Sequence, residues 1–509
     1  MLSTRELQAQ RLSLKTFLTC HPTNTWRRIY MWKFWEIERA HFKTLLESGK
    51  LDDHIEELYS HFWELPPSHQ YELVKYSKDK GIFPSVQTFR KVFKVSEETA
   101  VKFFKEKYIT FSFPVVLSNG EGELIEALAV KNLKEVITNL KNIKRHLNPI
   151  KEFLKTGFAV FFDGEFAGTS FQLPTVLNLY VENLSQDALF TGAIDKKGKI
   201  KSVDGIEEKK KLAKKLGLRL VEPYYLSTVD DLKAWFDAES YDVPLYITRT
   251  KDSWEGEFKS FLRATGISEE QLTKLEVLSG LETKPIITGQ LTGDAWENVL
   301  KEFWKRFKET EQKLHNKERF HIAINGPAVL AFAIGVLFGS QKPFVFYHYQ
   351  NNIYHPITVG NVRELKERKE SLEKIEQHFQ KGGKSLVVML SFAHHEMESD
   401  VKNYISQRVE NPSYLLLRAK SSGNIAVEDM REVATEAASV IQNIRREHSF
   451  EDFHFFLSTP VPIAFMVGLS FGHYAEGYIY NYAGRTYEPV VSFSFLKALR
   501  EGKYVLSEV

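Results

Sequence analysis

Hydrophobic and polar positions follow different periods in different parts of the chain. The first hundred residues show mainly helical spacing, and the next stretch mixes short apolar runs such as YITFSFPVV (108–116) and GFAVFF (157–162) with amphipathic segments. Farther on, apolar runs of strand length alternate with helical stretches, which is typical of β/α units around a parallel sheet. We therefore predict an α/β and α+β multidomain chain with three parts: a helical N-terminal region (1–107), a mixed α+β domain (108–240) and an α/β domain (244–509).

The α/β part contains an internal repeat. Residues 320–356 align without a gap on residues 453–489, at a constant offset of 133 positions and with twelve identities in 37 positions. Each copy predicts a strand, a Pro-containing turn, a small-residue helix and a second strand that leads to a Tyr-x-Pro end. Glycines inside the two helices, Gly335 and Gly468, indicate close packing of helix on sheet. Weaker similarity upstream extends the repeat to two halves: 244–357 and 384–490.

In parallel β/α sheets, ligands bind at the carboxyl ends of the strands, against helix N-termini. This chain places short turns rich in Gly, Ser and Thr at those positions, and their free N–H groups suit phosphates and other anions. The alternative is that they are only tight turns and helix caps. The candidate ligand-binding residues are Thr248, Thr288, Gly289, Gln290, Asn325, Gly326, Pro327, Ser391, Lys420, Ser421, Ser422, Gly423, Ser458, Thr459 and Pro460.

These features together resemble the SAVED domain. Both halves carry the resemblance: a strand entering a Pro turn, a small-residue helix that ends in Gly, and a Tyr-bearing strand with a Tyr-x-Pro end. That family consists of two CARF-like, Rossmann-like halves and senses cyclic oligonucleotides made during bacterial antiviral signalling. The resemblance covers roughly residues 244–509 and implies that the candidate residues bind a cyclic oligoadenylate.

A candidate nucleophile, Ser170, lies in the Gly-bearing turn FAGTSFQLP (166–174), just before a predicted helix. A serine nucleophile needs a general base, most often a histidine. No histidine occurs between His146 and His315, so another side chain must take the proton.

Lys209 is the candidate base. On a helical wheel it falls on the apolar face of the predicted helix 205–216, whereas the four other lysines of that helix face solvent. Burial lowers the pKa of a lysine, and a neutral lysine amine can act as a general base in a Ser–Lys pair. The alternative is a lysine whose stem packs while its head reaches water. Asp204 and Glu207 predict a capping box at the start of this helix.

Residues 108–240 resemble the Lon peptidase domain. The resemblance is carried by GTSFQLP around Ser170, by TGAIDKKGKIKSVDGIEEKKKLAKKLGL from Thr191, and by LVEP near the end. It implies that Ser170 and Lys209 form a dyad that hydrolyses peptide bonds, with Thr191 in support. The family usually has Ala-Gly after the serine, where this chain has Phe171-Gln172, so we expect the substrate pocket to differ there.

Composition and charge narrow the function classes. A net charge of +2 gives no global field that would call for a nucleic-acid or membrane partner. The single cysteine, Cys20, excludes intramolecular disulfides and Cys-based zinc sites. The N-terminus lacks the apolar segment of a secretory signal, so we expect a cytoplasmic location. The apolar run 320–339 approaches membrane-spanning length, but Asn325-Gly326-Pro327 divides it into a strand and a helix, and we expect no membrane span.

Two short motifs lack the chemistry that they suggest. GGKS at 382–385 is not a phosphate-binding loop, since His378 stands where that motif requires glycine, and we expect no ATP dependence. The run His394-His395-Glu396 lacks the spacing of a metal-binding motif, so we expect no metal.

A Lon-like part joined to a SAVED-like part resembles the CRISPR-associated Lon–SAVED proteases. This resemblance implies an ATP-independent serine endopeptidase without a cofactor, activated by cyclic oligoadenylate, and foremost by cyclic tetra-adenylate from a type III CRISPR complex. It also implies an anti-sigma-like protein substrate whose cleavage frees a sigma factor, a ligand-induced homo-oligomer, and no direct binding of DNA or RNA polymers. Two alternatives stay open: a ligand-binding scaffold with an inactive Lon-like domain, and a ring nuclease that degrades the cyclic nucleotide.

Overall fold

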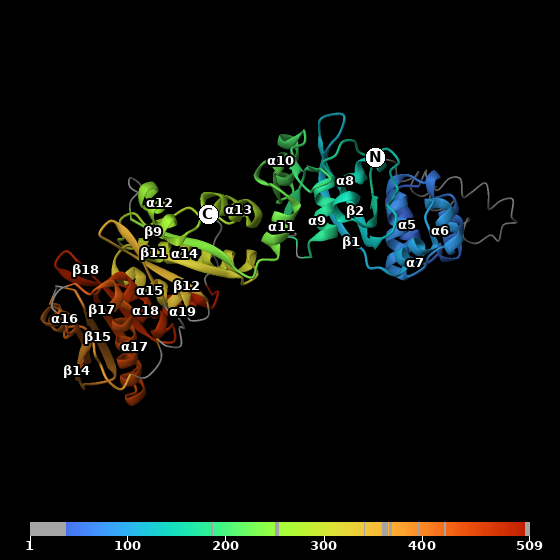
Figure 1. The fold of residues 1–509 in the computed structure, drawn as a ribbon. Coiled ribbons are helices and arrows are strands. Elements are labelled where there is room, and N and C mark those ends of the chain that lie inside the picture. The colour runs from blue at the N-terminus through green and yellow to red at the C-terminus, as the bar shows by residue number, and fades with distance from the viewer. Residues whose placement is uncertain are drawn as a thin grey trace. The chain divides into compact units, whose positions relative to one another are not determined.

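The computed structural model describes residues 37–182, 184, 187–249, 254–339, 342–358, 365, 369–393, 396–421 and 424–503 (Figure 1). The chain divides into two compact units, Met1–Asp237 and Ala238–Val509. In the first unit, one hydrophobic core joins a set of helices to a sheet. In the second unit, another core joins two sheets and the helices between them.

Five α-helices form the described part of the helical N-terminal region, blue in Figure 1. They are α3 (Arg39–Glu47), α4 (Ile55–Ser60), α5 (Pro67–Lys80), α6 (Val86–Phe93) and α7 (Glu97–Lys105). Serine side chains cap the start of two of them: Ser85 Oγ accepts a hydrogen bond from the Thr88 N–H at 3.2 Å, and Ser96 Oγ accepts one from the Thr99 N–H at 3.3 Å.

These helices pack on a four-stranded sheet with the order β1-β2-β4-β3. Its strands are β1 (Ile109–Val116), β2 (Gly122–Leu133), β3 (Ile137–Thr138) and β4 (Gly157–Phe162). Strands β1, β2 and β4 pair antiparallel, and β3 lies parallel to β4 at the edge. The predicted strands at 108–116 and 157–162 are confirmed, and β2 is a strand that the pattern did not predict.

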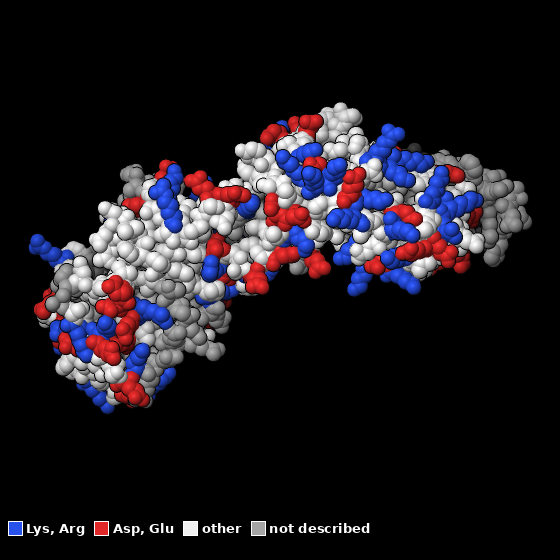
Figure 2. Space-filling view, in the orientation of Figure 1, with Lys and Arg blue, Asp and Glu red and all other residues white. Residues whose placement is uncertain are grey.

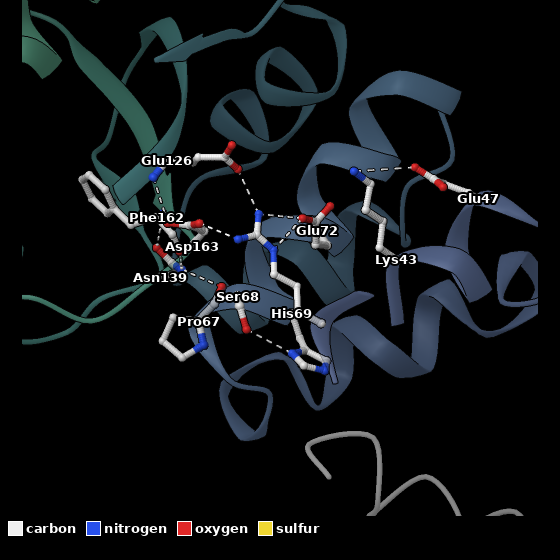
Figure 3. Close-up of polar contacts among 11 residues, drawn as sticks. Lys43, Glu47, Pro67, Ser68, His69, Glu72, Glu126, Asn139, Phe162 and Asp163 are labelled. Atoms are coloured by element: carbon white, nitrogen blue, oxygen red, sulfur yellow. Dashed lines mark hydrogen bonds and ion pairs between the residues drawn. The ribbon is translucent and has the colours of Figure 1, made fainter. Parts of the chain in front are cut away.

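Arg39 of α3 ties the helices to this sheet. Its guanidinium pairs with Glu72 of α5 at 2.7 Å, with Glu126 of β2 at 2.9 Å and with Asp163, just after β4, at 2.5 Å. Figure 3 shows the three carboxylates around that group. Asp163 begins the loop that leads to Ser170, so the helical region and this loop share one ion-pair network.

The remainder of the first unit surrounds the predicted serine turn. Its elements are α8 (Asn148–Leu154), α9 (Gln172–Tyr180), β5 (Ala188–Phe190), β6 (Ala193–Ile194), β7 (Ile200–Lys201), α10 (Ile206–Lys215), β8 (Arg219–Val221) and α11 (Val229–Phe236). The helix α10 matches the prediction, and β6 and β7 form an antiparallel hairpin before it. The capping box is wrong, since no side chain caps α10, and its N-cap is Gly205 in the left-handed conformation (φ 71°). A Cβ at Gly205 would lie 2.6 Å from Val116 Cγ2, which requires glycine there.

The second unit contains two sheets with corresponding strand orders, β10-β9-β11-β12-β13 and β14-β16-β15-β17-β18-β19. The first consists of β9 (Tyr241–Thr248), β10 (Ile286–Ile287), β11 (Glu318–Asn325), β12 (Phe344–Gln350) and β13 (Ile353–Thr358). The second consists of β14 (Ile375–Gln380), β15 (Ser385–Ser391), β16 (Ser413–Ala419), β17 (Asp452–Ser458), β18 (Gly477–Ala483) and β19 (Thr486–Ser492). The central strands are parallel and each sheet ends in an antiparallel hairpin, as the β/α repeat predicts.

Helices connect and cover these strands. They are α12 (Trp254–Thr265), α13 (Glu269–Ser279), α14 (Ala295–Lys313), α15 (Ala328–Phe338), α16 (Glu398–Ile405), α17 (Met430–Glu447), α18 (Val461–Phe471) and α19 (Phe493–Arg500). The apolar run 320–339 is divided between β11 and α15, as predicted. Within the described residues, no helix is long and apolar enough to cross a membrane.

Two glycines of the repeat meet where α15 and α18 cross. A Cβ at Gly335 would lie 2.1 Å from the Phe465 carbonyl oxygen, and a Cβ at Gly468 would lie 2.2 Å from the Phe332 carbonyl oxygen. The contact is reciprocal, because both residue pairs are related by the offset of the repeat. The predicted packing of these glycines on a sheet is therefore wrong: each contacts the backbone of the corresponding helix in the other half.

We expect Gly335→Ala to lower the free energy of unfolding of the second unit by about 2 kcal/mol or more, because the added Cβ must separate two backbones. Urea titration followed by circular dichroism measures this. The matched control is Gly256→Ala on α12, where a Cβ would meet nothing within 4 Å. That control should be neutral or stabilising by up to about 1 kcal/mol, since alanine favours helix. Equal effects of the two substitutions would contradict the tight crossing.

Candidate functional site

Ser170 lies in a turn between β4 and α9. Gly168, with a φ of 88°, makes the turn possible, and α9 begins two residues after the serine. Ser170 is mostly buried, with 7% of its surface exposed. Its carbonyl oxygen accepts a hydrogen bond from the Gly192 N–H at 3.1 Å, which joins the serine turn to the segment before the β6–β7 hairpin.

Lys209 is buried on the inner face of α10, as its helical position predicts; only 2% of its surface is exposed. Its ammonium nitrogen donates to Thr191 Oγ1 at 3.2 Å and to the Asp204 carbonyl oxygen at 2.9 Å. The solvent-facing lysines of the helix behave differently: Lys210 pairs with Glu207 and Glu222 at 3.1 Å each. One lysine of this basic helix is therefore directed inward and held by two oxygen acceptors.

Burial lowers the pKa of Lys209 from 10.5 to about 8, although the charges of Asp204 and Glu208 oppose the shift. At neutral pH, about a tenth of such a lysine is the neutral amine, compared with less than one in a thousand for an ordinary lysine. The buried site therefore supplies a proton acceptor where the sequence has no histidine.

Ser170 and Lys209 lie on either side of the dipeptide Thr191-Gly192. Gly192 binds the serine carbonyl through its N–H, and Thr191, fully buried, binds the lysine through its hydroxyl. No hydrogen bond joins Ser170 Oγ directly to Lys209 Nζ among the described residues. The structure thus brings all three predicted catalytic residues into one assembly, with the lysine amine resting on Thr191 and the Asp204 carbonyl.

The two residues that depart from the Lon pattern are buried. Phe171 is fully buried among aromatic rings that include Phe162 and Phe166. Gln172 donates through Nε2 to the His146 carbonyl at 2.6 Å and accepts at Oε1 from the Ile194 N–H at 3.0 Å. Whether these residues shape a substrate pocket stays a prediction. Gln172 fixes the segment that carries Thr191 against α9, a role that has no local signal in the sequence.

In the first half of the second unit, the predicted ligand residues gather at the carboxyl edge of the sheet. Thr248 ends β9 beside Asn325, which ends β11, and the Thr248 carbonyl accepts from the Thr288 N–H at 2.8 Å. Gly289 follows in the left-handed conformation, Gln290 is exposed, and Gly326 and Pro327 lead into α15.

Asn325 is the centre of a polar cluster that the sequence did not reveal. Its amide nitrogen donates to the Tyr246 hydroxyl at 2.7 Å, to Glu257 Oε2 at 3.0 Å and to the Tyr354 hydroxyl at 3.1 Å. Burial raises the pKa of Tyr354, which keeps its hydroxyl protonated. The first edge therefore carries two tyrosine hydroxyls and the Glu257 carboxylate around Asn325.

The second half gathers a different set. Ser391 pairs with Ser458 across β15 and β17, and the Ser458 carbonyl accepts from the N–H groups of residues 392 and 393. The hydroxyl of Thr459 is buried and has no hydrogen-bond partner among the described residues, and Pro460 precedes α18. Lys420 follows β16, and its N–H donates to the Lys374 carbonyl at 2.9 Å. Ser421 is exposed, and Ser422 and Gly423 lie outside the described residues.

An exposed tyrosine stands beside each edge. Tyr349 at the end of β12 and Tyr482 at the end of β18 are 39% and 44% exposed. They occupy corresponding places in the repeat, on hairpins whose tips extend past the carboxyl ends of the neighbouring parallel strands. Exposed rings at such an edge can stack on the bases of a nucleotide.

Two remaining motifs of the sequence lie in the second unit. The GGKS run leads into strand β15, which begins at Ser385. A phosphate-binding loop would instead lead into a helix. His394 and His395 lie outside the described residues. Elsewhere in the described chain, no group of three or more His, Cys, Asp or Glu residues could hold a metal ion.

Comparison with known proteins gives a family match within the second unit. Residues 300–493 match the family model SAVED, "SMODS-associated and fused to various effectors sensor domain". An Acinetobacter baumannii Cap4 SAVED/CARF-domain containing receptor with the cyclic trinucleotide 2'3'3'-cAAA matches with a TM-score of 0.34 and 13% identity, over 52% of this chain and 54% of that one. A Moraxella osloensis Cap4 SAVED/CARF-domain containing receptor matches with a TM-score of 0.33 and 11% identity, over 75% and 94%.

This chain thus spans about half the length of the Acinetobacter baumannii receptor. Comparison with curated proteins gives no match. The structural similarity is too weak to carry an argument. The family match confirms the predicted SAVED domain over residues 300–493.

The pKa of Lys209 makes stability depend on pH in a defined direction. Between about pH 8 and pH 10.5 the unfolded lysine holds a proton that the folded one lacks, so stability rises with pH across this window. We expect the free energy of unfolding of the native chain, relative to Lys209→Met, to rise by up to about 1.4 kcal/mol per pH unit. Urea titrations across this range measure it. The exposed Lys211→Met is the control and should show no such slope; a flat difference for Lys209→Met would contradict the buried amine.

Proposed function

We propose that this chain is a Lon-type serine endopeptidase controlled by a cyclic oligonucleotide that binds to its SAVED domain. The observation that carries the peptidase assignment is Lys209, buried in the first unit and bound to Thr191 beside Ser170. The resemblance to the CRISPR-associated Lon–SAVED proteases adds the finer terms: cyclic tetra-adenylate from a type III CRISPR complex as activator, an anti-sigma-like protein as substrate, and ligand-induced assembly of the chain.

The chemistry follows from the assembly around Thr191. Neutral Lys209 accepts the proton of Ser170, whose oxygen attacks the scissile carbonyl while N–H groups of the serine turn stabilise the oxyanion. Lys209 then protonates the leaving amine, and water hydrolyses the acyl-enzyme. Thr191 orients the lysine by accepting its hydrogen bond. The proton transfer requires Lys209 to exchange one of its present acceptors for Ser170 Oγ.

The ligand is assigned to the carboxyl edges of the two sheets. The N-termini of α15 and α18 lie at these edges and favour phosphates. The buried Thr459 hydroxyl has no partner within the described chain and can bind a ligand oxygen. Tyr349 and Tyr482 offer exposed rings for bases.

Among cyclic di-, tri-, tetra- and hexa-adenylate, we expect the tetra-adenylate to raise the melting temperature of the chain most. A ligand at about 100 times its Kd stabilises the folded state by about 2.7 kcal/mol. Differential scanning fluorimetry measures the shift. Tyr482→Ala should reduce it, whereas Tyr474→Ala should not, because Tyr474 is exposed but precedes β18 at the opposite end of that strand. Equal ligand-induced shifts of the melting temperature in the two variants would contradict ligand binding at the carboxyl edge that carries Tyr482.

Ser170→Ala and Lys209→Met should each reduce peptide-bond cleavage by about a thousandfold or more, because nucleophile and base act as a unit. Mass spectrometry of a peptide library, incubated with protein and cyclic tetra-adenylate, measures cleavage. Lys211→Met is the control for the basic helix and should retain activity. Activity of the native chain should rise with pH through about 8, as Lys209 loses its proton.

Undiminished cleavage by the Ser170→Ala variant would contradict the assignment of Ser170 as the nucleophile. Ligand binding without cleavage would favour the scaffold alternative, and breakdown of the cyclic nucleotide would favour the ring nuclease.

A further inference from the structure

A groove of about 600 Å³ lies in the first unit. Its lining residues fall between Ser60 and Lys144 and do not include Ser170, Thr191 or Lys209. One wall comes from α4, the 3-10 turn Phe62–Glu64 and α6 of the helical region. The other comes from β3 and the segment that follows it, up to Lys144. The groove exists because the helices pack on the sheet, the packing that Arg39 secures. Its volume falls in the range of sites that bind ligands of drug size or a few peptide residues.

Four lysines line this groove: Lys91, Lys94, Lys141 and Lys144. All four are exposed, and none forms an ion pair with another described residue. The described lining contains no Asp or Glu. Figure 2 shows basic and acidic side chains interspersed over the visible face of the first unit, so the lysines of the groove are identified by its lining. Four like charges around one concavity repel each other, so an anionic occupant is favoured electrostatically.

The floor of the groove is apolar and rigid. Trp63 is 37% exposed, and its indole N–H donates to the Val92 carbonyl at 3.0 Å, which fixes the ring. Phe93 and Ile137 also line the groove and are largely buried. The Lys141 ammonium lies 4.7 Å from the centre of the Trp63 ring, a cation–π distance. An occupant therefore meets apolar surface between the charges.

We propose that this groove binds an acidic peptide segment of a partner protein, in which carboxylates alternate with apolar side chains. The carboxylates would pair with the lysines at the rim while the apolar side chains cover the floor. A nucleic-acid strand fits less well, because it needs open aromatic faces for its bases and here Lys141 already covers the face of Trp63. This proposal stands independently of peptidase activity and of cyclic nucleotide.

Fluorescence anisotropy with labelled ten-residue peptides tests the groove on the full chain. We expect a peptide of alternating Glu and Leu to bind more tightly than a peptide of Glu alone, despite its lower charge. The charge reversal Lys91→Glu with Lys141→Glu should weaken its binding about tenfold or more. The matched control, Lys214→Glu with Lys215→Glu on the exposed side of α10, should leave binding unchanged.

A second variant, Lys91→Glu with Lys94→Glu, keeps the Lys141–Trp63 contact and should give a similar loss with an unchanged melting temperature. Equal loss in the α10 control, or no binding of either acidic peptide, would overturn the proposal. Equal affinity for both acidic peptides would refute the apolar floor as a determinant. Tighter binding of a ten-residue oligothymidylate, lost in the same variants, would reassign the groove to nucleic acid.

Discussion

The removal of one lysine amine from water is the constraint on which the proposed chemistry of the first unit depends. A buried ammonium is costly unless acceptors replace its hydration, and Lys209 has two: the Thr191 hydroxyl and the Asp204 carbonyl. Those acceptors are themselves positioned by glycine. Gly205, in the left-handed region, joins Asp204 to the start of α10 at Ile206, and Val116 leaves no room for a side chain at that position. A solvent-directed Lys209 would keep an ordinary pKa and lose its value as a base.

The serine side of the site depends on the same segment. Gly192 holds the Ser170 carbonyl, Thr191 holds the lysine, and Gln172 holds Ile194. Gln172, one of the residues that depart from the Lon pattern, thus helps to fix the segment that carries Thr191. Phe171, which precedes α9, packs against the rings of Phe162 and Phe166.

The sequence predicted what depends on regular spacing. Strands β1 and β4, the helix α10 and the inward position of Lys209 follow from periodic burial, and the repeat predicted the corresponding sheets. It did not predict what depends on partners far away in the chain. The Asn325 cluster joins residues from three separate strands and a helix, and no local period encodes that. Gly335 and Gly468 signalled close approach, but only the structure identifies the other helix as the partner.

The repeat preserves the crossing of α15 and α18 more strictly than it preserves the two edges. In the first half, Asn325 is surrounded by the Tyr246 and Tyr354 hydroxyls and the Glu257 carboxylate. In the second half, Ser458 stands at the corresponding position, Arg418 near the end of β16 pairs with Glu398 at 2.9 Å, and Lys420 follows β16. The backbone contact must be symmetric because each glycine faces the other helix. The edges are under no such constraint, and the two halves differ there in their polar side chains.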